Sequence, residues 1–99
     1  MTDNTVYIVA AKRSPIGRFQ GSLSRISPQE IGTQIIQDLA KIAPELIEQI
    51  DQIYCGQVLQ AGHGQNIARQ IALQVGAHQA TGTTLNMVCG SGMKSVIHG

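Results

Sequence analysis

LNMVCGSGMKSV, residues 85–96, places a cysteine at the end of an apolar run and three small residues directly after it. Residues 81–88 (TGTTLNMV), which lead into Cys89, are rich in threonine and β-branched side chains and predict a strand. From Cys89 onward, apolar side chains recur at helical spacing and predict a helix that continues to the end of the chain. A strand that passes directly into a helix is typical of sheets built from parallel strands, so this stretch indicates an α/β fold.

A first strand-and-helix unit is predicted near the amino terminus. Residues 5–11 (TVYIVAA) form a continuous apolar run, which is typical of a strand buried on both faces of a parallel sheet. After a long polar loop, Ser27 and Glu30 have the spacing of a capping box, with Pro28 at the first helical position. This pattern predicts a helix whose apolar repeat continues until Pro44.

A second unit lies between these two. Residues 50–59 (IDQIYCGQVL) form a mixed apolar run and predict a second strand. Asn66 is expected to cap a second helix, which Gly76 is expected to stop. Helices between successive strands imply crossovers, so the chain is predicted to hold three strand-and-helix units in one parallel sheet. The low aromatic content of 3% indicates that small and β-branched side chains pack between closely spaced layers.

The composition indicates one soluble, intracellular domain. The 99 residues are 42% hydrophobic and 13% charged, which supplies enough apolar surface for one core. The net charge of +1 and the scattered basic residues give no indication of nucleic acid or of a membrane surface as a partner. No apolar run approaches the roughly 20 residues of a membrane span, and the amino terminus lacks the order of a signal peptide. We therefore expect a cytoplasmic location in which Cys55 and Cys89 stay reduced.

The position of Cys89 permits two interpretations. At the start of a helix, free backbone N–H groups and the positive end of the helix dipole would favour the thiolate, which is the nucleophilic form of cysteine. The same N–H groups would stabilise the oxyanion that forms when a thiolate attacks a carbonyl carbon. Alternatively, Cys89 is a small apolar residue that packs at the end of a strand. The spacing of the residues leaves both interpretations open.

Other kinds of site fit the sequence less well. The glycines of residues 90–95 match only the first part of a dinucleotide-binding pattern, and a phosphate-binding loop requires glycine where Met93 precedes the Lys-Ser pair. The histidines and cysteines lack the short spacing of zinc ligands, so no metal site is predicted. Ser91 has no base near it in the sequence and is interpreted as a hydroxyl at the start of a helix rather than as a nucleophile.

Three segments resemble those of the thiolase family, in the same order and at the same spacing. NMVCGSGMKSV (86–96) is similar to the nucleophile segment, in which an asparagine stands three residues before the reactive cysteine. VYIVAAKRSPIGRFQGSL (6–23) is similar to the amino-terminal strand and the Arg-Thr-Pro-Ile-Gly loop that follows it, with Ser14 in place of threonine. GQVLQAGHGQNIARQIAL (56–73) is similar to the family's Gly-x-Val-x-x-Ala-Gly-x-Gly-Gln-Asn-x-Ala-Arg-Gln segment.

The departures from the family pattern are small. Gly90 and Ser95 stand where alanine is common, and neither exchange removes a reactive atom. The resemblance implies a thiolase-like α/β fold with two similar halves, each a mixed five-stranded sheet with helices on its faces. Residues 1–99 would then form the first part of the amino-terminal half, a partial domain that ends within the helix that carries the nucleophile.

The resemblance also implies an activity. Cys89 would be the catalytic residue that attacks an acyl-CoA thioester and holds the acyl group as an acyl-enzyme. Claisen condensation with a second acetyl-CoA would give acetoacetyl-CoA and CoA, so the protein would be an acetyl-CoA C-acyltransferase of fatty acid metabolism; thiolysis is the reverse reaction. An acyl-enzyme replaces one hard reaction with two easier ones. The resemblance implies no cofactor other than coenzyme A thioesters as substrates, and a homodimer or homotetramer.

The rest of the family's catalytic groups have no match in these 99 residues, so the isolated chain is expected to be inactive. His98 is unsuited to replace the activating histidine, because nine residues of helix place it roughly 13 Å from Cys89. Gln65, Asn66 and Arg69 either cap and solvate the second helix or, as the resemblance favours, contribute to a subunit interface. Two other functions stay open: a condensing enzyme of the ketoacyl synthase kind, which the Gly-Gln-Asn-x-Ala-Arg-Gln match disfavours, and a non-catalytic thiol protein.

Overall fold

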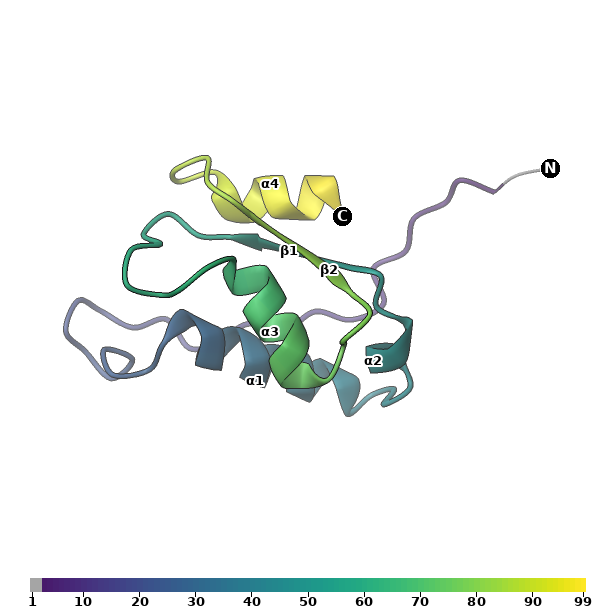
Figure 1. The fold of residues 1–99 in the computed structure, drawn as a ribbon, viewed down its shortest axis with the longest axis horizontal. Coiled ribbons are helices and arrows are strands. Elements are labelled where there is room, and N and C mark those ends of the chain that lie inside the picture. The colour runs from purple at the N-terminus through teal and green to yellow at the C-terminus, as the bar shows by residue number, and fades with distance from the viewer. Residues whose placement is uncertain (1–2) are drawn as a thin grey trace.

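The computed structural model describes residues 3–99, which contain two parallel strands and four helices. In chain order the elements are α1 (Pro28–Ala40), α2 (Leu46–Gln49), β1 (Gln52–Gly56), α3 (Ile67–Val75), β2 (Thr81–Leu85) and α4 (Ser91–His98). The strands form the middle layer: α4 covers one face of the sheet, α3 covers the other, and α1 packs on the outer side of α3 (Figure 1). The predicted α/β class is confirmed. None of the helices in residues 3–99 combines the length and the hydrophobicity that a membrane-spanning helix needs.

The sheet consists of β1 and β2, which are parallel neighbours. The chain crosses from the first strand to the second through α3. Their register starts with Gln52 opposite Thr81 and continues to Gly56. The parallel pairing predicted from the order of the segments is therefore confirmed. Each strand has five residues and is shorter than the predictions of 50–59 and 81–88, because apolar composition continues past the last pair of the ladder, where the chain leaves the sheet.

Helix α1 begins where the capping sequence predicts. The Oγ of Ser27 accepts a hydrogen bond from the backbone N of Glu30 at 3.1 Å, and Pro28 is the first helical residue. The helix ends at Ala40, shortly before Pro44. The single helical turn α2, which follows this proline, is an element that the sequence pattern does not predict.

Both ends of α3 are held as predicted. The Oδ1 of Asn66 accepts hydrogen bonds from the backbone N of Arg69 at 3.4 Å and from Thr84 Oγ1 at 2.8 Å. The Nδ2 of Asn66 donates to the carbonyl oxygen of Gly82 at 3.0 Å, so the cap also ties the helix to β2. At the other end, Gly76 has a φ of 89°, a left-handed conformation that glycine adopts without strain.

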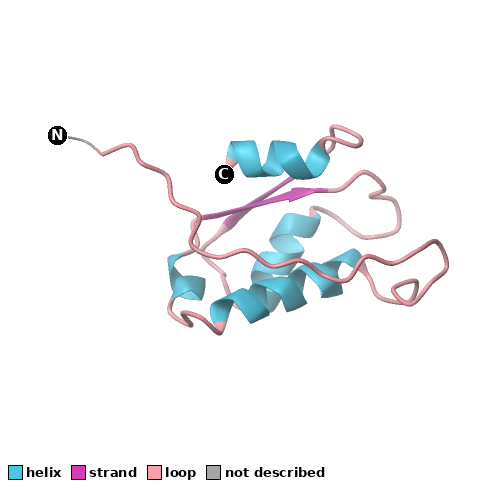
Figure 2. Ribbon diagram, turned by 180° about the vertical axis from the view of Figure 1, so that it is seen from behind, coloured by secondary structure: helices cyan, strands magenta, loops and turns pink. Residues whose placement is uncertain are grey.

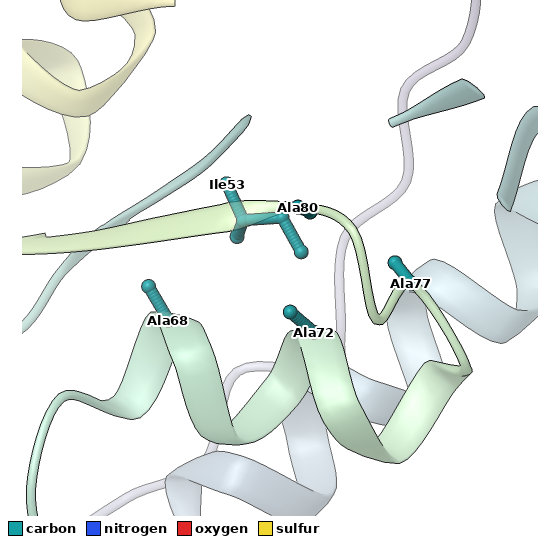
Figure 3. Close-up of a cluster of buried hydrophobic side chains, with 5 residues drawn as sticks. All are labelled: Ile53, Ala68, Ala72, Ala77 and Ala80. Atoms are coloured by element: carbon teal, nitrogen blue, oxygen red, sulfur yellow. The ribbon is translucent and has the colours of Figure 1, made fainter. Parts of the chain in front are cut away.

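The core between α3 and the strands is built mainly from alanine. Ala68 and Ala72 point from α3 toward the strands, where Ile53 of β1 meets them (Figure 3). Side chains this small let the helix lie close to the sheet: a Cβ at Gly82 would lie 2.5 Å from the backbone N of Arg69. The predicted close spacing of the layers is confirmed. The buried cluster consists of Ile53, Ala68, Ala72, Ala77 and Ala80.

Helix α4 rests on the other face of the sheet at one glycine. A Cβ at Gly56, the last residue of β1, would lie 2.5 Å from the carbonyl oxygen of Ser91 and 2.8 Å from the backbone N of Gly92. Side-chain carbons do not come this close to backbone atoms, so only glycine lets α4 begin at this place. Near the other end of α4, His98 stacks on Tyr54 of β1 with the ring centroids 5.7 Å apart.

The strand predicted over residues 5–11 is wrong for the described chain. Figure 2 shows this segment as a loop, and among residues 3–99 it pairs with no strand. Val6 is 85% and Ile8 87% exposed, while residues 7–10 line one wall of an apolar groove against α1, α2 and the start of β1. A continuous apolar run indicates that a segment is to be buried, but a strand forms only where a neighbouring backbone pairs with it.

The third predicted helix begins later than expected. Helix α4 starts at Ser91 rather than at Cys89, because residues 87–90 form a turn between β2 and the helix. The same turn explains why β2 stops before residue 88. Cys89 therefore lies in the turn and not in the helix.

The double role of Asn66 predicts that its replacement destabilises the protein. Asn66→Ala removes the helix cap and both bonds to β2, so we expect the free energy of unfolding to fall by about 1–2 kcal/mol. Asn66→Asp is the matched control, because its carboxylate keeps the capping oxygen and loses only the donor to Gly82. Urea unfolding followed by circular dichroism measures both variants. An alanine variant as stable as the parent protein would show that the cap is unimportant.

The contact at Gly56 predicts that one added methyl group displaces α4. Gly56→Ala forces a Cβ against backbone atoms that cannot rotate away, so the free energy of unfolding is expected to fall by about 1–3 kcal/mol. Gly92→Ala is the control, since a Cβ there meets nothing within 4 Å and alanine favours a helix over glycine. Thermal unfolding of both variants tests this expectation, and equal melting temperatures would contradict it.

Candidate active site at the Cys89 turn

Cys89 lies in a tight turn between β2 and α4. The backbone N of Gly90 donates a hydrogen bond to the carbonyl oxygen of Met87 at 3.1 Å, and the backbone N of Ser91 donates to that of Val88 at 3.1 Å. These bonds close two overlapping turns around Cys89, whose side chain is exposed. The thiol is thus at the surface of the described chain, at the junction of strand and helix.

Val88, the residue before Cys89, has an unfavourable backbone conformation. Its φ of 49° lies in the left-handed region, which costs an L-residue about 1–2 kcal/mol and is an outlier for a β-branched side chain. Two side chains hold it there: the backbone N of Val88 donates to Asn86 Oδ1 at 2.9 Å, and its carbonyl oxygen accepts from Ser91 Oγ at 2.6 Å. The strained residue is therefore stabilised from both sides.

Ser91 is the first residue of α4 and is only 4% exposed. Its Oγ donates to the carbonyl oxygen of Val88 and accepts from the backbone N of Met87 at 2.9 Å. The hydroxyl is engaged with the backbone, which agrees with its interpretation as a structural group and not as a nucleophile. It binds the end of the preceding segment, whereas a capping hydroxyl binds the N–H groups of its own helix.

Asn86 connects the turn to the segment that follows β1. Its Oδ1 accepts from the backbone N of Val88, and its Nδ2 donates to the carbonyl oxygen of Val58 at 3.3 Å. In the sequence, Asn86 stands out only as the asparagine three residues before Cys89. The local signal for its role is the tendency of asparagine to accept a hydrogen bond from the backbone two residues later, as in an Asx turn.

Backbone donors near the thiol are unpaired. Within residues 3–99, the N–H groups of Cys89, Gly92 and Met93 have no hydrogen-bond acceptor, while the backbone N of Lys94 already donates to the carbonyl oxygen of Gly90 at 2.9 Å. These groups belong to the positive end of the α4 dipole or lie next to it. An oxygen that gains negative charge beside Cys89 can be stabilised by such donors.

The two cysteines differ in their surroundings. Cys55 of β1 packs against the core cluster, and this burial raises the pKa of its thiol. Cys89 is exposed, and neither thiol forms a disulfide. A cysteine that serves only as a small apolar residue needs burial, so packing explains Cys55 better than Cys89.

The segment around Asn66 supports the fold of this chain. The Nη1 of Arg69 donates to the carbonyl oxygens of His78 at 3.0 Å and Ala80 at 2.7 Å, which ties α3 to the loop before β2. Asn66 caps the helix, and Gln65 is exposed beside it. The capping alternative for Asn66 is confirmed, while a contribution of this segment to a subunit interface stays a prediction.

His98 does not extend the site around Cys89. His98 stacks on Tyr54 at the far end of α4, whereas Cys89 lies in the turn before the helix. Within the described part of the chain, no three His, Cys, Asp or Glu side chains lie together in a way that would hold a metal ion. The turn is the only part of the described chain that combines an exposed thiol with unpaired helix-start donors.

Known proteins with similar sequences share one activity in their names. An acetyl-CoA acetyltransferase of Allochromatium vinosum is 50% identical over 97 residues, which are 97% of this chain and 24% of that protein. Acetyl-CoA acetyltransferase IB of Candida tropicalis is 46% identical over 100% of this chain and 25% of its own length. The mitochondrial acetyl-CoA acetyltransferase of Danio rerio is 44% identical over 95% and 23%. The chain thus spans about a quarter of the length of the curated relatives it matches.

A solved structure has the same fold. The Acat5 thiolase from Ascaris suum, in complex with coenzyme A, superposes on 86% of this chain and 22% of its own, with a TM-score of 0.80 and 34% sequence identity. The fold expected from the resemblance is therefore confirmed for the described part of the chain. The profile of the family described as "Thiolase, N-terminal domain" matches residues 6–99, and the chain belongs to the thiolase family.

Proposed function

We propose that the protein containing this chain is a thiolase-type acyltransferase, an acetyl-CoA C-acyltransferase, and that Cys89 is its nucleophile. The observation that carries the proposal is an exposed thiol in a hydrogen-bonded turn, beside unpaired backbone donors at the start of a helix. The relatives named acetyl-CoA acetyltransferase, and the relative solved with coenzyme A, support the class of substrate.

In the first proposed step, the thiolate of Cys89 attacks the thioester carbonyl carbon of acetyl-CoA. A sulfur–carbon bond forms and the carbonyl oxygen becomes an oxyanion, for which the N–H groups at the start of α4 are available donors. The oxyanion then collapses, the bond to the coenzyme A sulfur breaks, and coenzyme A leaves as a thiolate. The acetyl group stays on Cys89 as a new thioester.

In the second step, another acetyl-CoA loses a proton from its α-carbon. The resulting carbanion attacks the acetyl group on Cys89, releases the thiolate and gives acetoacetyl-CoA; thiolysis is the reverse reaction. The groups that accept the thiol proton and the α-proton are expected outside these 99 residues, since the activating histidine and the other catalytic groups of the family have no match in them. The 99-residue chain by itself is therefore expected to be inactive.

Cofactor, assembly and location are proposed from the family. We expect no cofactor apart from the coenzyme A thioesters, a role in fatty acid metabolism, and a homodimer or homotetramer. The expected cytoplasmic location stays a prediction, since one relative is named as mitochondrial.

The two alternatives have less support. A condensing enzyme of the ketoacyl synthase kind is opposed by the match of residues 6–99 to the thiolase profile. A non-catalytic thiol protein in which Cys89 only packs is opposed by the exposure of Cys89, whereas one in which Cys89 senses oxidants is tested by the labelling with acetyl-CoA below.

The different burial of the two thiols predicts their order of alkylation. Iodoacetamide is expected to modify Cys89 roughly tenfold or more faster than Cys55, because Cys55 is half-buried and has a raised pKa. Trypsin cuts after Arg69 and thereby separates the two cysteines onto different peptides, so timed alkylation and mass spectrometry give both rates. Faster modification of Cys55 would contradict the assigned exposures.

The proposed acyl-enzyme predicts a specific labelling pattern. Incubation of the full-length protein with radiolabelled acetyl-CoA is expected to leave a thioester on Cys89. Cys89→Ser should abolish this label and lower turnover by roughly a thousandfold or more, because serine lacks the acidity of the thiol. Cys55→Ala is the matched control and should retain the label. A label that survives in the Cys89→Ser variant, or a parent protein that takes up none, would refute the proposal.

A further inference from the structure

The hydroxyl group of Ser91 is buried and bonded to the residues just before Cys89, yet the proposed reaction does not use it directly. We propose that Ser91 is a positioning residue, which holds the Cys89 thiol in its attacking orientation by fixing the strained backbone of Val88. This inference rests on the proposed function, in which Cys89 is the nucleophile.

The hydroxyl of Ser91 forms two hydrogen bonds to this backbone, in addition to the one that the backbone N of Ser91 donates to the carbonyl oxygen of Val88 at 3.1 Å. Its Oγ donates to the carbonyl oxygen of Val88 at 2.6 Å and accepts from the backbone N of Met87 at 2.9 Å. Because Ser91 is only 4% exposed, water cannot readily replace either bond. The hydroxyl thus binds the backbone of both residues that precede Cys89: the carbonyl oxygen of Val88 and the N–H group of Met87.

The position of Ser91 is itself set by the sheet. A Cβ at Gly56 would lie 2.5 Å from the carbonyl oxygen of Ser91, so the backbone of Ser91 rests directly on the last residue of β1. Its Oγ is therefore anchored to the packed part of the fold and not to the turn alone. Through Ser91, the sheet determines where the turn lies.

Val88 needs such an anchor because a φ of 49° is unfavourable for a β-branched residue. Without the hydroxyl, the carbonyl oxygen of Val88 keeps only the longer bond from the backbone N of Ser91, and Met87 loses its acceptor, so Val88 can relax toward negative φ. That relaxation rotates the peptide group that leads into Cys89 and shifts its sulfur atom. A displacement of about 1 Å at a reacting atom costs on the order of a hundredfold in rate.

The test compares Ser91→Ala, Ser91→Thr and Ser95→Ala in the full-length protein. Ser91→Ala is expected to lower kcat of acetyl transfer roughly 10- to 100-fold and to change KM for acetyl-CoA by less than about twofold. Ser91→Thr keeps the hydroxyl and should restore most of kcat. Ser95→Ala is the matched control, because its Oγ donates to the carbonyl oxygen of Gly92 at 2.6 Å, within the same helix. It should leave kcat within about twofold of the parent.

A double-mutant cycle tests the route through Val88. Glycine adopts positive φ without strain, so Val88→Gly removes the need for the hydroxyl. In that background, Ser91→Ala is expected to lower kcat by less than about threefold. An equal loss of kcat in both backgrounds would overturn the proposal, since it would show that Ser91 acts independently of Val88.

Asn86 provides a second test if Ser91→Ala does not fold. Asn86→Ala removes the acceptor of the Val88 backbone N, so it should lower kcat in the same way, while Asn86→Asp keeps that acceptor and should retain most of kcat. Unchanged kcat in both the Asn86→Ala and the Ser91→Ala variants would overturn the proposal, as would a loss in Ser95→Ala equal to that in Ser91→Ala.

Labelling with radioactive acetyl-CoA separates this inference from the proposed function. If the parent protein forms acetyl-Cys89 and Ser91→Ala forms it at the same rate, the role of Ser91 is wrong and Cys89 stands as the nucleophile. If the parent protein forms no acetyl-Cys89, the proposed function is wrong, and the role of Ser91 falls with it. Slower acetylation in Ser91→Ala at an unchanged extent of binding supports the positioning role.

Discussion

The fold depends on two places where the backbone of a helix touches the backbone of a strand. At Gly82 the start of α3 lies against β2, and at Gly56 the start of α4 lies against β1 on the other face of the sheet. A single methyl group at either glycine would meet backbone atoms that move only if the helix moves. The alanine cluster fills the narrow space that remains beside α3. Two such contacts therefore determine where both helices begin.

This constraint reaches the candidate active site through the turn before α4. Because the first residues of α4 must lie against Gly56 of β1, the chain has few residues in which to leave β2 and enter the helix. The left-handed conformation of Val88 accomplishes this sharp change of direction, and Asn86 and Ser91 stabilise it. Backbone strain that neighbouring groups hold in place is common at functional sites, where it orients a reactive group before the substrate arrives. In the proposed function, that group is the thiol of Cys89.

The parts of the fold that could be predicted from the sequence are those that depend on neighbours in the chain. Ser27 and Asn66 cap their helices through bonds to residues three positions later, and Gly76 stops α3 by its own conformation. The strand over residues 5–11 could not be judged in this way, because its pairing requires a separate segment. The hydrogen bonds of Ser91 could not be predicted from the sequence either. Its hydroxyl bonds to the backbone of Met87 and Val88 in an irregular turn, and no periodic sequence pattern indicates such a turn.

Sequence alone was enough to predict the order of the second and third strand-and-helix units, the caps of α1 and α3, the family, and the place of Cys89 between a strand and a helix. These features follow from residue types at short spacings and from segments matched in order. Three features became known from the folded structure: Cys55 is half-buried while Cys89 is exposed, α4 begins at Ser91, and Val88 is strained. The reason is that burial, close backbone contact and the resulting strain all arise between segments that lie far apart in the chain and meet only when it folds.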